Sequence, residues 1–280
     1  MDTIIELFGF GFFQNALLAA LLASIICGIT GTYIVSRKIV FISGGITHAS
    51  FGGIGLGYYL GFNPLLGAAV FSIISALGIE FLYRKVNVRQ DSAIAMLWSL
   101  GMALGIIFVY LTPGYAPNLM SYLFGNILTV TQIDLLLMLA LALVVILIFS
   151  FFFQEILFIS FDEAFAKTRG LPVKTISSAL MTLIALTIVL NIRVVGIILV
   201  ISLLSIPQAT ANLFTRDFRK MIPLSILFSF IGTFAGLLVS FYADIPSGAS
   251  IIFTLIVFFF LLKVIILAWK KRTLLRKEEL

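Results

Sequence analysis

Residues 39–79 read IVFISGGITHASFGGIGLGYYLGFNPLLGAAVFSIISALGI, and none of them carries a formal charge. A transmembrane helix needs about 20 consecutive apolar residues, so this stretch is long enough for two spans. The short sequence FNP (62–64) separates them and is typical of a turn. The stretch therefore predicts an all-α, membrane-spanning fold and excludes an ordinary soluble domain.

The rest of the chain has the same character. Of its 280 residues, 61% are hydrophobic and only 11% are charged, whereas a soluble domain has about 25% charged residues. The single cysteine, Cys27, rules out an internal disulfide framework. No polar segment is long enough for a soluble domain, so we expect residues 1–280 to form one transmembrane domain.

The apolar runs predict a polytopic helical bundle of about nine spans. Eight spans would remain if the first or second run did not cross the membrane fully. The runs cover residues 9–35, 40–60, 64–83, 91–111, 131–153, 174–192, 195–214, 221–242 and 249–269.

The basic residues alternate between the connections, which predicts an orientation. On this division, 17 of the 18 Lys and Arg side chains belong to one side of the membrane, and Arg193 lies on the other. Because cytoplasmic loops carry an excess of Lys and Arg, we expect the N-terminus outside and the C-terminus in the cytoplasm. The formal charge of +6 does not indicate a nucleic-acid partner, since the basic residues fall in small groups at the ends of spans.

The loop at residues 112–130 is long for this chain and rich in Pro, Gly and Asn. It contains the apolar piece SYLFGNIL (121–128), which is too short to span a bilayer. Irregular backbone at membrane depth is tolerated only where protein or a water-filled cavity surrounds it. The loop is predicted to be either a short helix or re-entrant turn beside a cavity, or a plain external loop.

The only histidine, His48, lies in an uncharged span rich in small residues. Gly53 and Gly57 permit close helix approach, while Gly44 and Gly45 weaken the helix. A lone histidine usually packs as a neutral side chain bonded to a neighbour. A buried polar group left unpaired, however, costs about 1–3 kcal/mol, and ionisable residues at membrane depth mark functional sites. Both interpretations of His48 stay open on the residues alone.

A second distinctive segment, residues 160–173, lies on the basic side and contains FDEAFAKTRG (161–170). It combines a side-chain cap, charges that complement the helix dipole, and a glycine stop, which together predict a short helix. These roles fall to Ser160 or Asp162 at the N-cap, Asp162 and Glu163 in the first turn, Lys167 and Arg169 in the last turn, and Gly170 followed by Pro172.

Phe161 and Phe165 are spaced one helical turn apart in this segment and are predicted to form an apolar stripe. On a cytoplasmic loop such a stripe meets either lipid headgroups or another protein. The residues predict an interfacial helix or a protein-docking helix, and they do not decide between the two.

Six segments, in order along residues 12–270, resemble the permease subunits of bacterial ABC importers for metal ions of the zinc and manganese class. They are GGITHASFGGIGLGYYLGFNP (44–64), QDSAIAMLWSLGMALGI (90–106), SYLFGNIL (121–128), FDEAFAKTRGL (161–171), VVGIILVISLLSIPQATANLFTRDFRK (194–220) and DIPSGASI (244–251).

This resemblance implies a multi-pass protein of the bacterial inner membrane that forms a homodimer, with the translocation path along the subunit interface. An external metal-binding protein would deliver the ion. The cytoplasmic short helix would dock on a separate ATPase, because the chain has no GxxxxGK[ST] motif and is therefore not itself an enzyme. The residues assigned to this coupling are Phe161, Asp162, Glu163, Phe165, Arg169 and Gly170.

The resemblance also makes His48 a metal ligand, with one departure from the family's pattern. Family members commonly carry an Asp four residues before this His, and here that position is Gly44. Two copies of His48 would then face each other across the dimer, joined by Thr47, Ser43 or water. Imidazole suits zinc and carboxylate suits manganese, so the departure favours zinc, with manganese or iron as alternatives. No permanently bound cofactor is expected, only the transported ion.

Two other functions remain as alternatives: a permease for a metal chelate, and a secondary transporter or channel independent of ATP. The second would normally show ionisable groups within its spans, and here only His48 lies clearly inside one. An intramembrane metalloprotease would need a pair of histidines such as HExxH, which one histidine cannot provide.

Overall fold

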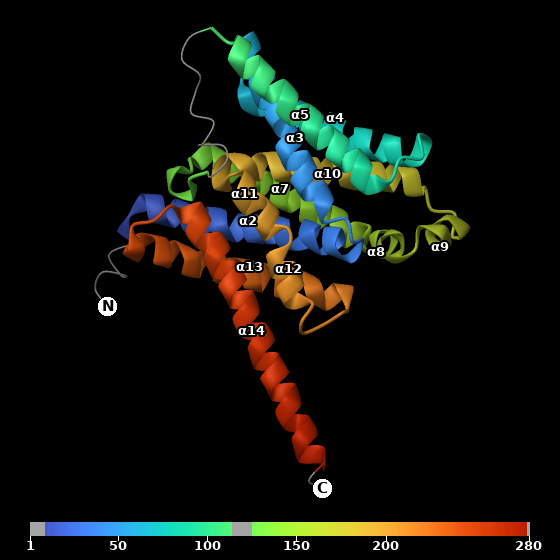
Figure 1. Cartoon of the computed structure of the whole chain (residues 1–280), viewed down its shortest axis with the longest axis vertical. Coiled ribbons are helices and arrows are strands. Elements are labelled where there is room, and N and C mark those ends of the chain that lie inside the picture. The colour runs from blue at the N-terminus through green and yellow to red at the C-terminus, as the bar shows by residue number, and fades with distance from the viewer. Residues whose placement is uncertain (1–8, 114–124, 279–280) are drawn as a thin grey trace.

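A computed structural model describes residues 9–113 and 125–278, and every regular element in these ranges is a helix (Figure 1). The predicted all-α class is therefore confirmed. The elements are α2 (Gly11–Ser36), α3 (Phe41–Leu60), α4 (Pro64–Lys85), α5 (Gln90–Leu111), the 3₁₀ turn η1 (Ile127–Thr129), α7 (Gln132–Phe151), α8 (Phe153–Phe161), α9 (Glu163–Thr168), α10 (Val173–Val195), α11 (Ile197–Leu203), α12 (Ile206–Ala211), α13 (Phe218–Ala243) and α14 (Ser247–Glu278).

Seven of the described helices are long and apolar enough to cross a membrane: α2, α4, α5, α7, α10, α13 and α14. The predicted span 40–60 coincides with α3, which has 20 residues but contains many small and weakly apolar ones. The predicted count of eight to nine spans is neither reached nor excluded by these helices and stays a prediction.

The predicted span 195–214 was wrong as a single helix. It is divided into α11 and α12, with a break at Leu204 and Ser205. Ser205 has backbone angles outside the helical region (φ −132°, ψ −50°), and Pro207 follows in the first turn of α12. Proline fixes its own φ and has no N–H to donate, so it is favoured where a new helix begins and disfavoured within one.

The loop predicted at 112–130 lies largely outside the described residues, because these omit 114–124. Its described end forms η1, whose cap is the Asn126 side chain accepting a hydrogen bond from the Leu128 N–H at 3.1 Å. Just before it, Gly125 has φ +60° and lies against the backbone of Val195 and Gly196. This end of the loop is therefore held against the junction of α10 and α11.

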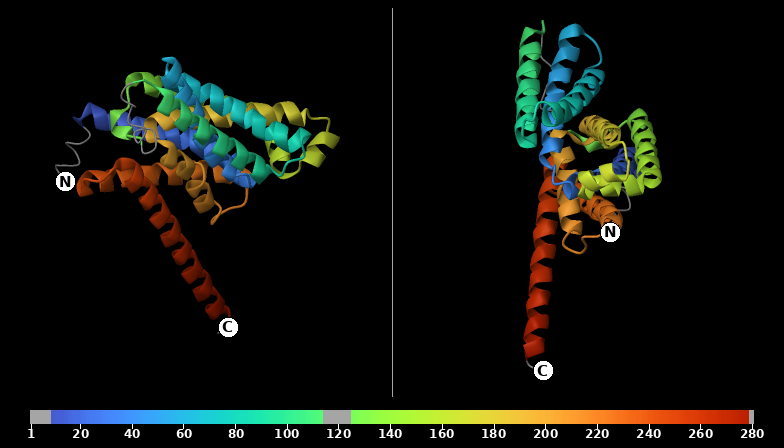
Figure 2. Two further views of the ribbon diagram at one scale, coloured as in Figure 1. Left: turned by 45° about the horizontal axis from the view of Figure 1, so that its top comes forward. Right: turned by 90° about the vertical axis from the view of Figure 1, so that its right-hand side faces the viewer.

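Two helix groups make up the body of the protein. α3, α4 and α5 form one group, and α2 packs against α7 and α13 in the other; α10 lies between the groups, packed mainly on α4 and also touching α2 and α7 (Figures 1 and 2). α2 is the most buried of the seven long helices, which makes it the centre of its group. α14 projects from the body, and only a small share of its apolar stretch is buried (Figure 2).

The group of α3, α4 and α5 is held together at glycines. A Cβ atom on Gly53 would overlap the carbonyl oxygen of Gly67 in α4, and one on Gly105 in α5 would lie 2.6 Å from the carbonyl oxygen of Phe51. Membrane helices gain no hydrophobic energy from leaving lipid for each other, so their association depends on such close packing. α3 thus touches both neighbours backbone to backbone.

This packing predicts that one methyl group on α3 is enough to disturb the fold. Gly53→Ala would force α3 and α4 apart, and overpacking of this kind costs about 1–3 kcal/mol. We expect a lower midpoint of thermal unfolding for the purified protein in detergent. Gly78→Ala is the matched control, because its Cβ would lie 3.6 Å from Leu97, an ordinary contact. Equal midpoints for the two variants would contradict the packing argument.

Candidate functional site

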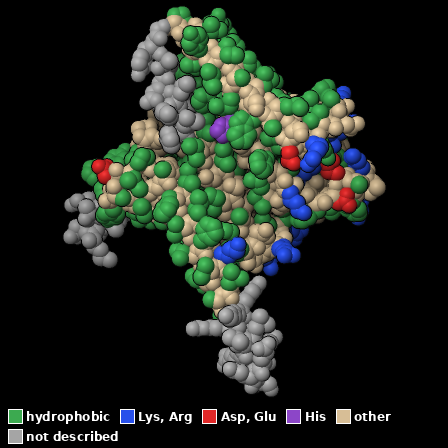
Figure 3. Space-filling view, viewed as in Figure 1, with side chains coloured by type: hydrophobic (Ala, Val, Ile, Leu, Met, Phe, Trp, Pro, Cys, Tyr) green, Lys and Arg blue, Asp and Glu red, His purple; other side chains and the backbone are tan. Residues whose placement is uncertain are grey.

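His48 lies near the middle of α3, on a face of the protein that is open to the surroundings (Figure 3). Its imidazole is stacked on the ring of Trp98 from α5, with 4.4 Å between ring centroids and 6° between ring planes. Its Nδ1 is buried and has no hydrogen-bond partner among the described residues. The packing interpretation of His48 expects a hydrogen-bond partner for the ring, and none is found at Nδ1; stacking on Trp98 is what orients the partly exposed ring.

Ser43 and Thr47, predicted as supporting ligands, do not share this open face. Both are fully buried, whereas His48 is partly exposed. The Ser43 hydroxyl donates to the Val40 carbonyl at 2.6 Å, and the Thr47 hydroxyl donates to the Ser43 carbonyl. Both hydroxyls are therefore engaged with the backbone of their own helix, and the structure does not bring them to the imidazole.

The four glycines of the predicted site divide between two roles. A Cβ on Gly44 would lie 3.5 Å from Trp98, the side chain that also carries the His48 ring, so this position has room for a side chain. Gly45 lies against Ile94 in α5, and Gly53 and Gly57 lie against Gly67 and Pro64 in α4. Only Gly44 is therefore placed next to the imidazole.

One copy of the chain brings few metal ligands together. Among the described residues, no group of three or more His, Cys, Asp and Glu side chains is close enough to hold a metal ion. A metal at His48 would need further ligands from outside the described chain.

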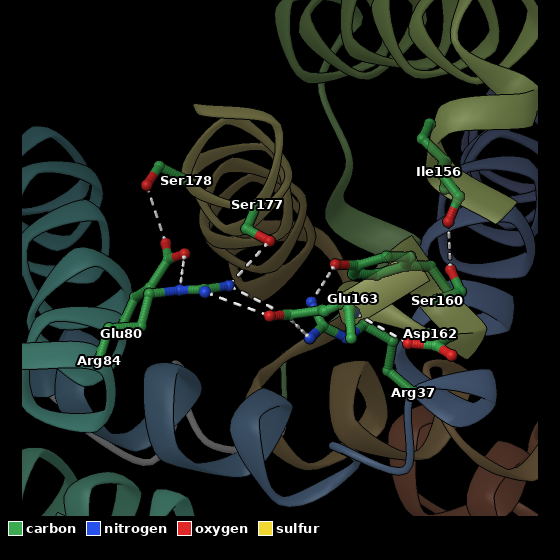
Figure 4. A network of polar contacts seen from close by, with 11 residues as sticks. Arg37, Glu80, Arg84, Ile156, Ser160, Asp162, Glu163, Ser177 and Ser178 are labelled. Atoms are coloured by element: carbon green, nitrogen blue, oxygen red, sulfur yellow. Dashed lines mark hydrogen bonds and ion pairs between the residues drawn. The ribbon is translucent and has the colours of Figure 1, made fainter. Parts of the chain in front are cut away.

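The segment 160–173 forms a short helix with the predicted ends. Asp162 is the N-cap, since its carboxylate accepts hydrogen bonds from the N–H groups of Ala164 at 2.8 Å and Phe165 at 3.0 Å. Ser160, the alternative cap, instead donates to the Ile156 carbonyl within α8 (Figure 4). Gly170 has φ +75°, the left-handed conformation that ends the helix.

The predicted stripe of Phe161 and Phe165 is wrong in one respect: the two side chains belong to different helices. Phe161 is the last residue of α8, and the extended backbone of Asp162 (φ −151°, ψ 101°) separates it from α9. Phe161 meets the ring of Phe218 at 6.5 Å, and Phe165 meets Phe158 at 5.5 Å. The rings remain 63% and 42% exposed, so both still present apolar surface.

A network of charged side chains, not predicted from the sequence, fixes α9 to three longer helices (Figure 4). Glu163, the first residue of α9, accepts hydrogen bonds from Arg37, which follows α2, and from Arg84 near the end of α4, with 2.9 Å between Arg84 Nη2 and Glu163 Oε1. Arg84 also donates to Ser177 of α10 at 3.2 Å. The short helix is therefore anchored through one carboxylate.

A second carboxylate completes this network. Glu80 lies one turn before Arg84 in α4 and accepts from its Nε at 2.9 Å. The other oxygen of Glu80 accepts from the Ser178 hydroxyl of α10 at 2.9 Å. The spacing of Glu80 and Arg84, four residues apart near a helix end, is the one sequence signal that would have indicated part of this arrangement.

The network changes the proton affinity of Glu163. Partial burial acts to raise the pKa of this carboxyl, but the hydrogen bonds and charges of Arg84 and Arg37 outweigh burial and lower the pKa below its ordinary value. Glu163 is therefore a carboxylate at neutral pH. At the other end of α10, Arg193 pairs with Asp134 of α7 at 2.8 Å.

These features define a class of protein. The apolar helices form a multi-pass membrane bundle, and the charged side chains gather at one end of it, around α8, α9 and the adjoining ends of α4 and α10 (Figure 3). A short capped helix, α9, lies at that end, with the exposed aromatic rings of Phe161 and Phe165 beside it.

Comparison with known proteins places the chain within this class. Residues 9–266 match the model of the ABC 3 transport family. The manganese transport system membrane protein MntC of Halalkalibacterium halodurans is 36% identical over 88% of this chain and 85% of that protein. The manganese import system permease protein ScaB of Streptococcus gordonii is 32% identical over 96% of this chain and 95% of that protein.

A solved structure gives the same result. PsaBC from Streptococcus pneumoniae, in complex with a Fab, superposes with a TM-score of 0.82 at 33% identity, over 93% of this chain and 94% of the other. The chain belongs to the ABC 3 transport family. It is therefore a multi-pass permease subunit of the inner membrane and not itself an enzyme, as the sequence resemblance implied.

The charge network predicts a pH-dependent contribution of Glu163 to stability. A carboxyl whose pKa is lowered by folding stabilises the fold above its unfolded pKa of about 4.3, and this stabilisation is lost as the pH falls through the folded value. We expect Glu163→Gln to lower the unfolding midpoint at pH 7, at a cost of about 1–2 kcal/mol for a partly exposed charged hydrogen bond.

The difference between the unfolding midpoints of wild type and Glu163→Gln should become smaller as the pH falls below about 4. Thermal unfolding in detergent from pH 7 to pH 3.5 measures it. Asp162→Asn is the matched control, because it removes a charge one residue away while an Asn side chain still caps the helix. If the difference in unfolding midpoint stays constant with pH, the ion pairs of Glu163 are not the cause of the lost stability.

Proposed function

We propose that the chain is the membrane-spanning permease of an importer for divalent transition-metal ions, and that His48 is a transit ligand for the ion. The observation that carries this proposal is the partly exposed imidazole of His48 near the middle of α3, which is stacked on Trp98 and whose buried Nδ1 has no hydrogen-bond partner among the described residues. Neutral imidazole nitrogen is a common ligand for such ions. The names of relatives similar over nearly the full chain support a metal as cargo.

The proposed transport unit contains two copies of the permease. One copy offers a single imidazole and, among its described residues, no further cluster of ligands. Two copies with their open faces together would supply two imidazoles to one ion. Trp98 would keep each ring in a fixed orientation, which limits the entropy lost when the ion binds.

Two observations favour different metals for this site. The names of the relatives favour manganese. The ligand set of this chain favours zinc, because Gly44 provides no carboxylate beside His48 and imidazole alone suits zinc better than manganese. We propose zinc as the preferred ion and manganese as the alternative.

The proposed direction of transport follows from the charges. The end that carries α9 holds most of the basic side chains, so we assign it to the cytoplasm (Figure 3). There α9 would dock on a separate ATPase through the exposed rings of Phe161 and Phe165, with Asp162, Glu163, Arg169 and Gly170 shaping the helix. A metal-binding protein would deliver the ion at the opposite end.

The metal-ligand role of His48 predicts a loss of uptake without a loss of assembly. In a strain whose growth in chelator-treated medium depends on this permease, His48→Ala should reduce uptake of ⁶⁵Zn and ⁵⁴Mn. The expected reduction is roughly tenfold or more, the scale on which lost metal-site interactions act. Membrane expression and copurification with the ATPase should stay unchanged.

Two further variants distinguish the imidazole from its surroundings. Ser43→Ala and Thr47→Val remove hydroxyls that are bonded to the helix backbone, so uptake should remain near wild type. Wild-type uptake by His48→Ala would return the histidine to a packing role. Metal uptake that persists in a strain lacking the ATPase would instead favour a transporter independent of ATP, and uptake only of a chelated metal would favour a chelate permease.

The docking role of α9 predicts that its C-terminal conformation matters. At Gly170, φ is +75° and nothing lies within 4 Å of the Cβ position, so Gly170→Val tests backbone strain alone. We expect a cost of about 1–2 kcal/mol and weaker copurification with the ATPase. Gly170→Asn is the control, because Asn tolerates this conformation.

Phe165→Asp tests the same docking surface by charge. The variant should insert in the membrane but lose stable association with the ATPase. If both Gly170→Val and Phe165→Asp copurify with the ATPase and transport normally, α9 is only a membrane-surface helix.

A further inference from the structure

A cavity of about 350 Å³ opens between α4 and α10 at the basic end of the bundle, apart from the His48 face. Its polar wall contains Arg84, Lys85, Lys174 and Ser178, together with Glu80. Its apolar wall consists of Leu77 and Phe81. The proposed transport route uses none of these apolar or lysine side chains.

The charges in the cavity leave an excess of two positive groups. Arg84 is paired with Glu80 and Glu163. Lys85 and Lys174, in contrast, have no ion-pair partner among the described residues, and both are exposed. The N-terminus of α10 at Val173 adds the partial positive charge of a helix dipole. An anionic group is therefore favoured here.

The apolar wall extends from this positive group toward the membrane interior. Leu77, Phe81 and Lys85 follow one another at intervals of four residues, so they form one stripe along α4. Phe81 is 54% exposed, and the Lys85 ammonium lies 5.8 Å from the centre of its ring. One turn deeper, Ile74 is 59% exposed and continues the stripe. An occupant would meet cations at the membrane edge and apolar side chains below them.

We propose that this cavity binds an anionic glycerophospholipid, with its phosphate between Lys85 and Lys174 and an acyl chain along Phe81, Leu77 and Ile74. Basic pockets between membrane helices at the cytoplasmic surface are suited to such headgroups. A soluble anion would match the lysines but leave the apolar stripe unused. An acidic surface of the ATPase would also match the lysines, but it could not follow the stripe into the membrane.

This site touches the network that anchors α9. Arg84 forms part of the cavity wall and donates to Glu163 from its other side. The Ser178 hydroxyl, also in the wall, donates to Glu80. A lipid phosphate bound there would place another negative charge near Arg84. Because Arg84 also binds Glu163, the headgroup would act on α9 through this one guanidinium.

The test counts bound lipids on the full-length chain. The protein, purified in detergent, is titrated with phosphatidylglycerol or with phosphatidylcholine of the same acyl chains, and bound lipid is measured by native mass spectrometry. We expect phosphatidylglycerol to bind more tightly. Lys85→Gln with Lys174→Gln should weaken it about 25-fold, since each lysine near an anionic headgroup contributes about a fivefold factor.

Three controls make the result decisive. Lys38→Gln with Lys220→Gln removes two exposed charges elsewhere at the basic end and should leave binding unchanged. Lys85→Arg with Lys174→Arg keeps both positive charges and should therefore retain phosphatidylglycerol binding. Inorganic phosphate at the same concentration should not displace the lipid.

Equal binding of the two lipids, or equal binding by both Gln double variants, would overturn the proposal. Displacement by inorganic phosphate would assign the site to a free anion. Loss of ATPase copurification by Lys85→Gln with Lys174→Gln, with lipid binding intact, would assign the lysines to a protein interface. None of these outcomes depends on whether His48 carries metal.

Discussion

The fold depends on backbone contact between α3 and its neighbours. Within a bilayer, helices gain little by exchanging lipid for each other, so association has to come from close van der Waals packing and interhelical hydrogen bonds. Gly53 meets Gly67 in α4, and Gly105 in α5 meets the backbone at Phe51, with no side chain between them. This contact fixes the rotation of α3, and rotation decides that His48 faces outward while Ser43 and Thr47 face inward.

The second constraint is that partly buried charged side chains at the basic end need partners of opposite charge. Removing charges from water is costly unless each finds a partner. Arg84 meets this requirement with two carboxylates, Glu80 within its own helix and Glu163 in α9. Glu163 also pairs with Arg37, and breaking that contact would leave the partly buried Arg37 guanidinium without a carboxylate. The short helix is thus held more firmly than its own six residues would allow.

The sequence was sufficient for features that depend on local chemistry and composition. Apolar runs predicted the helices of 20 or more residues, and the cap at Asp162 and the stop at Gly170 were predicted because each needs only neighbouring residues. Features that join distant segments were not predictable. Nothing local indicates that Arg37 and Glu163, 126 residues apart, form an ion pair. Likewise, the stacking of His48 on Trp98 follows from how α3 and α5 are packed, and no periodicity within α3 contains that information.

These two constraints meet at the turn between α2 and α3. Arg37 directly follows α2, and α3 begins at Phe41, so only residues 38–40 separate the ion pair with α9 from the helix that carries His48. Ile39 in this turn is buried and its N–H donates to the Ile34 carbonyl at 3.1 Å, which ties the turn to the end of α2. Glu163 therefore joins α9, through Arg37, to the turn that leads into α3. α3 in turn touches its neighbours both at backbone, where Gly53 meets Gly67, and at side chains, where Gly45 meets Ile94, so α9, this turn and the helix that carries His48 belong to one connected set of contacts.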